Sequence, residues 1–199
     1  MKLLVEQGFW FGSSGFYPYE IGQSCRFNSA SSEYLHFTPS GDGNRRTFTF
    51  SAWVKRSTLL TTNSTAHPIV TWQNDSENSD WDQLRFTSAN FGGGTNHNEI
   101  QFMLDGASDG HLLTSGLFRD TSSWYHIMVA VDTTQAIAVN RVKFYANGQL
   151  LETAAENGTY PYYTENFETN VNQASSKHFI GSFNDARNFD GLITQNYLI

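Results

Sequence analysis

Residues 124–152, WYHIMVAVDTTQAIAVNRVKFYANGQLLE, predict three adjacent β-strands and decide the fold. Both sets of alternating positions in the first strand, Trp124–Asp132, are largely apolar, so we expect this strand to be buried on both faces. The second predicted strand, Val142–Ala146, is followed by the dipeptide NG. This dipeptide favours a type I′ hairpin, in which both central residues have positive φ. The pattern therefore predicts that Gln149–Glu152 returns beside the second strand.

Shorter segments with similar patterns fill much of the remaining chain. Thr47–Lys55 alternates cleanly between apolar and polar positions. Other predicted strands, separated by turn residues, are Ser24–Asn28, Tyr34–Phe37, His67–Trp72, Asp82–Thr87, Glu99–Leu104, His111–Ser115, Lys177–Phe183 and Phe189–Leu198. No helical periodicity is visible between them. About eleven short strands predict an all-β fold, a two-sheet antiparallel sandwich or jelly roll.

Composition and charge exclude several classes of protein. The 199 residues suit one β domain, and aromatic residues make up 15% of the chain. A net charge of −7 without a basic run argues against a nucleic-acid surface. No apolar run approaches the roughly 18 residues of a membrane span. Cys25 is the single cysteine, and Leu3–Val5 is too short for a signal peptide, so we expect synthesis in a cytoplasm.

The first 21 residues differ from the rest and are interpreted as an N-terminal arm before a domain at 22–199. The arm is rich in glycine and aromatic residues and lacks alternation. Its large aromatic side chains would favour aggregation if they were left in water. The arm therefore packs on a neighbouring chain, which implies a homo-oligomer, or it folds as a coil over its own domain. The candidate assembly residues are Phe9, Trp10, Phe11, Phe16, Tyr17 and Tyr19.

Several motifs together resemble one family. They are WYHI (124–127) after Asp120, VKFYANGQLLE (142–152), FIG (179–181) and FDGLI (189–193). In this order they resemble laminin G-like domains, which have the concanavalin A-like lectin and glucanase fold and are close to pentraxins. The resemblance implies a β-sandwich and, because such domains often bind calcium at one rim, a Ca²⁺ site.

A narrower resemblance covers most of the chain. GFYPYEI (15–21), RFN (26–28), TP (38–39) and GNRRTFTFSAWVKR (43–56) are similar to laminin G-like proteins of tailed, often marine, bacteriophages. Members of that group are usually described as virion, tail-fibre or host-adhesion proteins. The family usually continues past its closing strand with an acidic residue, whereas Gln195 stands near that position here and the sequence stops at Ile199. We therefore expect the last strand to be incomplete or to be completed by another subunit.

The resemblance implies a function in the virion. The expected protein is non-enzymatic, is made in the host cytoplasm, contacts other virion structural proteins and binds host surface polysaccharide through a lectin-like module. One alternative is a structural decoration protein that contacts only other virion proteins. Another is a glycan hydrolase with the concanavalin A-like fold.

The residues themselves argue against hydrolysis. Glucanases of this fold use two carboxylates at alternate positions of one strand, so that both reach a single sugar bond. No predicted strand carries such a pair, and Asp80 with Asp82 comes closest, in an acidic loop. No Ser–His–Asp arrangement is apparent, and His126 is expected in the core. We therefore assign no catalytic residue.

Two acidic loops contain oxygen ligands of the kind that Ca²⁺ prefers. The candidate ligands are Asp75, Glu77, Asp80, Asp82, Asp105 and Asp109. The second loop resembles the start of a calcium loop, but Ala107 lacks a ligand oxygen and no Glu stands at the twelfth position. The alternative is that these residues are solvated, because Asp favours turns in any case.

Sugar sites combine an aromatic plane with polar groups on loops, since sugar rings have apolar faces and polar edges. Polar residues flank Trp81, which makes it the leading candidate, whereas core packing explains Trp72 equally well. The candidate glycan-binding residues are Trp81, Asn74, Asn78, Tyr162 and Tyr163.

Overall fold

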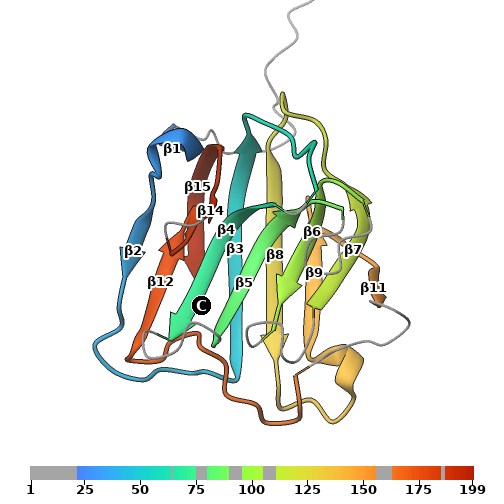
Figure 1. Ribbon diagram of the computed structural model, residues 1–199. Helices are drawn as coiled ribbons and strands as arrows, with labels where there is room; N and C mark the ends of the chain where they lie inside the picture. The colour runs from blue at the N-terminus through green and yellow to red at the C-terminus, as the bar shows by residue number, and fades with distance from the viewer. Residues whose placement is uncertain are drawn as a thin grey trace, which may run out of the picture.

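The computed structural model describes residues 22–63, 65–74, 80–89, 96–104, 111–155, 163–184 and 187–199. These residues form two antiparallel sheets packed face to face, so the predicted β-sandwich is confirmed (Figure 1). The arm at residues 1–21, with its six aromatic candidates, lies outside the described residues. Helical structure is limited to the 3₁₀ turns η1 (Ser29–Ser31) and η3 (Ala138–Asn140) in the described ranges. No helix there has the length and apolarity that crossing a membrane requires.

The first sheet, sheet A, contains the segment that decides the fold. Its strands, in spatial order, are β1 (Cys25–Phe27), β15 (Gly191–Leu198), β3 (Thr47–Arg56), β8 (Tyr125–Asp132), β9 (Val142–Ala146) and β10 (Gln149–Leu150). Between β9 and β10, Asn147 and Gly148 have φ values of 51° and 78°, which confirms the predicted turn.

The second sheet, sheet B, faces the first across the core. Its strands, in spatial order, are β11 (Thr153–Ala155), β7 (His111–Leu117), β6 (Glu99–Met103), β5 (Trp81–Thr87), β4 (Ala66–Asn74), β12 (Ser176–Ile180) and β2 (Leu35–Phe37). The chain passes from sheet A to sheet B between β10 and β11. The predicted return strand Gln149–Glu152 is therefore too long, because β10 ends at Leu150 and the next strand belongs to the other sheet.

Aromatic side chains fill the space between the two sheets. Trp72 on β4 is 1% exposed and lies edge-on to Phe50 and Phe102, with ring centroids 5.6 and 6.4 Å apart. Phe102 in turn lies edge-on to Phe144. Such edge-to-face pairs contribute about 0.5–1.5 kcal/mol each beyond the area that they bury. The core therefore joins β3 and β9 of sheet A to β4 and β6 of sheet B.

The prediction that β8 is buried on both faces is wrong. Ile127, Val129 and Val131 point into the core, but His126 and Met128 are half-buried on the outer face of sheet A. There the His126 ring lies 5.1 Å from the Trp53 ring, so His126 is not a core histidine. The apolar residues on this side of β8 pack against neighbouring side chains on the outer face of sheet A, and no second layer covers them fully, so they stay half-exposed.

β15 pairs with β3 from Gly191 to Leu198, and Ile199 exchanges backbone hydrogen bonds with Thr49, so this side of the last strand is paired along its length. On its other side β15 pairs with β1 only at Gly191–Ile193 in the described ranges, and completion of that edge by another subunit stays a prediction. Gln195 has a φ of 47° at a register shift within this strand. At Gly191 a Cβ atom would lie 2.1 Å from the carbonyl oxygen of Lys55, so the close approach of β15 to β3 requires glycine.

Candidate functional site

Trp81 stands at the start of β5, on the outer face of sheet B. Leu84 and Phe86 of the same strand point into the core, and alternation therefore places Trp81 on the opposite face. The register pairs Trp81 with Gln73 on β4, and Gln73 with Lys177 on β12. Residues paired directly across strands share one face of a sheet, so these three side chains form a row.

A small hairpin completes this surface. Strands β13 (Ser182–Phe183) and β14 (Arg187–Asn188) pair with each other and lie against β4, where the Thr71 hydroxyl donates to the Ser182 carbonyl at 2.8 Å. The Phe183 ring lies 4.8 Å from the Trp81 ring, at 56° between the ring planes. The Arg187 guanidinium lies 5.9 Å from the centre of the Phe183 ring. The hairpin thus brings an aromatic and a cationic side chain to Trp81.

We call the surface made by Trp81, Phe183, Arg187, Lys177 and Gln73 the Trp81 patch. Four of these side chains are half-exposed, and Gln73 is 5% exposed behind them. The patch therefore presents two neighbouring aromatic rings, two cations and an amide. This combination suits a ligand with an apolar plane and a polar rim.

Buried polar side chains support the patch. Arg85 Nε donates to Gln101 Oε1 at 2.7 Å, and Arg85 Nη1 donates to Gln83 Oε1 at 3.0 Å. Gln83 Nε2 then donates to Thr71 Oγ1 at 2.9 Å, which links the network to the β13–β14 hairpin. Burial, with a smaller effect from nearby Arg187, lowers the pKa of Arg85 to about 9. The network fixes the face of β4, β5 and β6 on which the patch is built.

Tyr163 was predicted as a glycan contact, but the structure places it in the core. Its ring is 0% exposed and stacks on Phe167, with centroids 4.9 Å apart. Its hydroxyl donates to Asp82 Oδ1, and the backbone N–H of Asn170 donates to Asp82 Oδ2 at 2.9 Å. Asp82 is likewise 0% exposed. Because both groups are buried, Tyr163 offers no ring face to a sugar, and Asp82 does not reach a rim ligand.

Asn74 and Asp80 lie together at the adjoining ends of β4 and β5. Asn74 Nδ2 donates to Asp80 Oδ2 at 3.1 Å, and Asn170 Nδ2 donates to Asp80 Oδ1 at 2.5 Å. Every oxygen of Asp80 and Asp82 thus accepts a hydrogen bond. Within the described ranges, no three His, Cys, Asp or Glu side chains come together as metal ligands. The carboxylates of Asp80 and Asp82 are thus held by hydrogen bonds, and the calcium site expected at this loop stays a prediction.

The remaining candidates cannot be placed. Asn78, Tyr162, Asp75, Glu77, Asp105 and Asp109 lie outside the described residues. In contrast, Phe183 and Arg187 belong to the patch and were not predicted. The segment SFNDAR at 182–187 carries a turn signal between an aromatic and a cationic residue, but nothing local to it indicates contact with Trp81.

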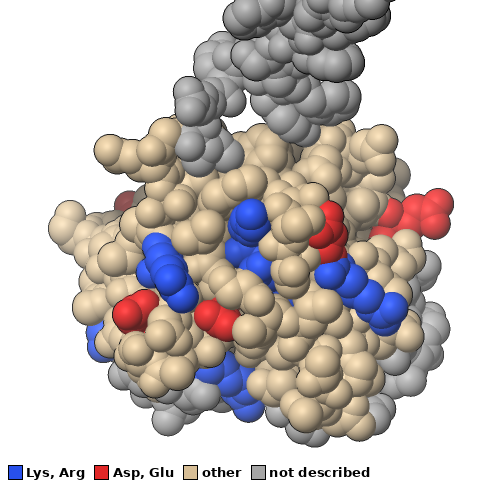
Figure 2. All heavy atoms as spheres, turned by 90° about the horizontal axis from the view of Figure 1, so that it is seen from above, with Lys and Arg blue, Asp and Glu red and all other residues tan. Residues whose placement is uncertain are grey.

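Among the described residues, the surface in Figure 2 has no patch of a single charge sign. On this end of the sandwich, Lys and Arg side chains are interspersed with Asp and Glu among the described residues (Figure 2). Elsewhere, just before the start of β3, Arg46 Nη2 lies 2.8 Å from Glu168 Oε1. Exposed ion pairs of this kind contribute little to stability, about 0–1 kcal/mol. The surface in Figure 2 is therefore of mixed sign.

Comparisons with known proteins agree with this architecture. Residues 29–197 match the family model described as the concanavalin A-like lectin/glucanases superfamily. No curated protein matches the chain. Among solved structures, domains LG4–5 of the mouse laminin alpha1 chain align with a TM-score of 0.56 and 11% identity, over 92% of this chain and 43% of that one. At this identity the likeness concerns the fold alone.

One bacterial structure and one bacteriophage structure also have a similar fold. Domain 4 of an extracellular GH43 arabinanase from Geobacillus stearothermophilus, solved with arabinotriose, has a TM-score of 0.54 and 17% identity, over 90% of this chain and 71% of that one. The enzymatically active domain of tailspike protein 2 from bacteriophage CBA120 has a TM-score of 0.52 and 15% identity, over 88% of this chain and 25% of that one. The chain thus spans less than half of the laminin structure and a quarter of the tailspike.

Proposed function

Because the chain belongs to the concanavalin A-like lectin/glucanases superfamily, we propose that it is a carbohydrate-binding module whose sugar lies on the Trp81 patch. The observation that carries this proposal is the contact of Trp81 with Phe183, at 4.8 Å between ring centroids, on an outer sheet face with Arg187 beside it. The apolar face of a sugar ring packs on an aromatic plane. Its hydroxyls accept hydrogen bonds from Arg187 and Lys177, and the amide of Gln73 lies at the base of the patch.

The proposed activity is binding without turnover. Asp80 and Asp82 have the alternate spacing of a glucanase pair, but Asp82 is fully buried and receives hydrogen bonds from Tyr163 and Asn170. A carboxylate in that position does not reach a glycosidic bond on the surface. The five described side chains that define the Trp81 patch are aromatic, amide and cationic, so none of these five is a carboxylic acid that could protonate a leaving group.

The proposed ligand is a bacterial surface polysaccharide, and the proposed setting is the virion of a tailed bacteriophage. This part of the proposal is supported by the resemblance of residues 15–56 to bacteriophage laminin G-like proteins and by the similar fold of the CBA120 tailspike domain. A structural decoration protein is the second candidate. It is favoured by apolar side chains that are exposed at the edges of the sandwich, such as Phe37 at 51% and Leu150 at 61%.

A polysaccharide panel tests the proposal. Purified protein is incubated with bacterial surface polysaccharides, first with calcium and then with chelator, while released reducing sugar is measured. We expect saturable binding to at least one polysaccharide and no release of reducing sugar. Loss of binding in chelator would assign a role to calcium at residues outside the Trp81 patch. Folded protein that binds nothing in either condition would favour the decoration protein, and released sugar would overturn the non-enzymatic assignment.

A further inference from the structure

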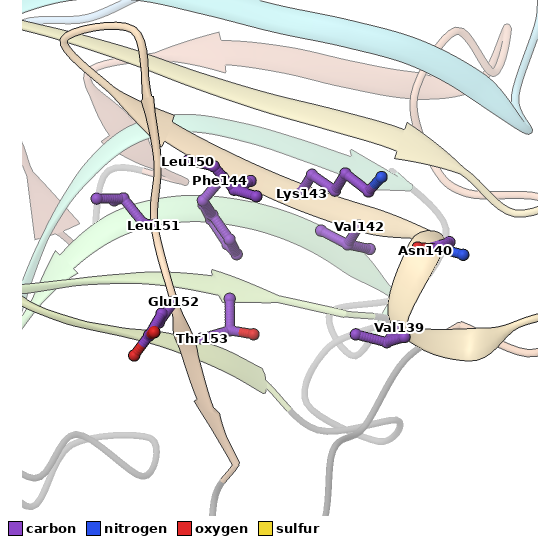
Figure 3. Close-up of a pocket in the computed structure, with 9 residues that line it drawn as sticks. All are labelled: Val139, Asn140, Val142, Lys143, Phe144, Leu150, Leu151, Glu152 and Thr153. Atoms are coloured by element: carbon purple, nitrogen blue, oxygen red, sulfur yellow. The ribbon is translucent and has the colours of Figure 1, made fainter.

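An apolar groove opens at one edge of the sandwich, where the chain crosses from β10 to β11. It has a volume of about 660 Å³ and lies between η3, β9 and the crossover segment (Figure 3). Val139, Val142, Phe144 and Leu150 line it, and Lys143 is among its polar residues. Leu150 is 61% exposed and Val139 is 55% exposed, which is high for side chains of this size in water. The groove is thus open to a partner and exposes two apolar side chains, Val139 and Leu150, beside the polar residues Asn140, Lys143, Glu152 and Thr153.

The backbone beside the groove is also open. β10 pairs with only Tyr145 and Ala146 of β9, and Leu151 N–H donates to the Phe144 carbonyl. In the part of the chain that the structure describes, no strand pairs with the outer edge of Val142–Lys143. An open strand edge beside apolar side chains binds extended peptide segments by strand addition. The groove therefore favours an extended, apolar segment over a compact surface.

The N-terminal arm has the composition of such a segment. Its 21 residues include FWF at 9–11 and, closer to the domain, Phe16, Tyr17 and Tyr19. The arm joins the domain at Gly22, next to β1. β1 and β10 are opposite edges of sheet A, with four strands between them. The point at which the arm joins the domain and the groove are thus at opposite edges of sheet A, about 24 Å apart at a strand spacing of about 4.8 Å.

We propose that the groove binds residues 9–11 of the arm of a second copy of this chain. Extended chain covers about 3.4 Å per residue, so an arm of this length reaches well beyond its own domain. Binding its own groove would make the residues between the bound segment and Gly22 cross the sheet and close a loop, which costs chain entropy. A neighbouring copy presents its groove without that crossing. One arm and one groove on opposite edges make a head-to-tail contact, which closes into a ring or continues as a filament.

The mass of the full chain in solution tests this contact. By sedimentation velocity at rising concentration, we expect the wild-type chain to form oligomers. Leu150→Asp, which puts a charge into the groove, should shift the chain to monomer mass. Leu117→Asp is the matched control, because Leu117 is 42% exposed on β7 and is not among the residues that line the groove, and this variant should remain oligomeric. A monomeric wild-type chain, or equal oligomerisation of both variants, would overturn the proposal.

Cross-linking identifies the occupant. In a Cys25→Ser background, which removes the exposed native thiol, Trp10→Cys and Leu150→Cys are introduced into separate chains with different tags and then mixed. We expect a disulfide-linked species that contains both tags. A chain carrying both substitutions that links only to itself would show that the arm binds its own groove.

Phe37→Ser tests the opposite apolar edge, and loss of oligomers in that variant but not in Leu150→Asp would place the interface there instead. This proposal does not depend on sugar binding by the Trp81 patch.

Discussion

The backbone N–H of Asn172 donates a hydrogen bond to Nε2 of His178, at 3.1 Å. Nδ1 of the same ring lies 3.1 Å from the carbonyl oxygen of Ser176, so Nδ1 carries the proton and donates it. Only the neutral imidazole makes both hydrogen bonds, because a protonated Nε2 cannot accept. His178 is 1% exposed, packed against Phe37 and Trp72. Burial lowers its pKa to about 4, against a smaller opposing effect of the hydrogen bond to Ser176.

This arrangement predicts that acid destabilises the fold. The pKa of His178 is lower in the folded chain than the ordinary value near 6.5, so the unfolded chain binds the proton first as the pH falls. The contribution of the neutral ring is complete above pH 6.5 and is lost progressively as the pH falls towards 4. It amounts to about 3 kcal/mol at most. Urea unfolding at pH 7, 6, 5 and 4 measures it.

His178→Gln is the matched variant, since it removes the titrating ring and keeps a side-chain oxygen that can accept from Asn172. His67, whose pKa burial lowers to about 4, remains in both proteins, so it contributes equally to the pH dependence of the two unfolding free energies. We expect the difference in unfolding free energy between wild type and variant to shrink from pH 7 to pH 4. Parallel pH profiles would contradict the assignment of a neutral His178.

Tyr163→Phe should destabilise the protein by about 1–3 kcal/mol, because it leaves an oxygen of buried Asp82 without its hydroxyl donor. The ring and its stacking on Phe167 are kept. Tyr145→Phe is the control, since Tyr145 is half-buried on the outer face of sheet A, and it should change the unfolding free energy by less than about 0.5 kcal/mol. Equal effects of the two variants in urea unfolding would show that the Tyr163 hydroxyl contributes nothing.

We expect the charge of Arg56 to be unnecessary for the stability of the fold. It is 1% exposed, its Nη1 donates to the Phe118 carbonyl at 2.7 Å, and its guanidinium lies 4.3 Å from the centre of the Phe86 ring. Burial lowers its pKa to about 10, with a smaller opposing effect of Tyr125.

Arg56→Met keeps the length of the side chain and removes the desolvated charge, so its unfolding free energy should stay within about 1 kcal/mol of wild type or exceed it. Arg56→Ala leaves a cavity and should cost about 2–5 kcal/mol. Thermal and urea unfolding of the two variants decide the matter. If methionine proved as damaging as alanine, the guanidinium rather than its volume would be stabilising the core.

The sequence was sufficient for the fold because its strongest signals are local. Asn147-Gly148 needs only two residues to specify a turn, and Thr47–Lys55 shows its buried face by alternation. The error at β8 arose because His126 and Met128 pack beside neighbours on an outer sheet face, and periodicity does not distinguish that face from a core. Burial on the second face depends on whether another layer covers the sheet, which no local pattern encodes.

The site was less predictable because its parts are distant in sequence. Trp81 was found from its polar flanks, but its partner Phe183 lies about a hundred residues later, on a hairpin that only the folded sheet brings near. Tyr163 was misassigned because it follows Tyr160 and Tyr162 in a segment without strand alternation, which looks like an exposed loop. Its buried acceptor, Asp82, lies on β5 and is 81 residues away in the sequence, so only the fold brings the two together.

The central claim is that the Trp81 patch binds carbohydrate, and the affinity of matched tryptophan variants tests it most directly. Isothermal titration calorimetry with the polysaccharide selected from the panel would compare wild type, Trp81→Ala and Trp53→Ala. Trp53 is the control because it is a half-exposed tryptophan on the opposite sheet, with its ring 5.1 Å from the His126 ring. We expect Trp81→Ala to weaken binding at least about tenfold, by roughly 1.4 kcal/mol or more, with Trp53→Ala unchanged. Unchanged affinity in folded Trp81→Ala, or a loss confined to Trp53→Ala, would contradict the account.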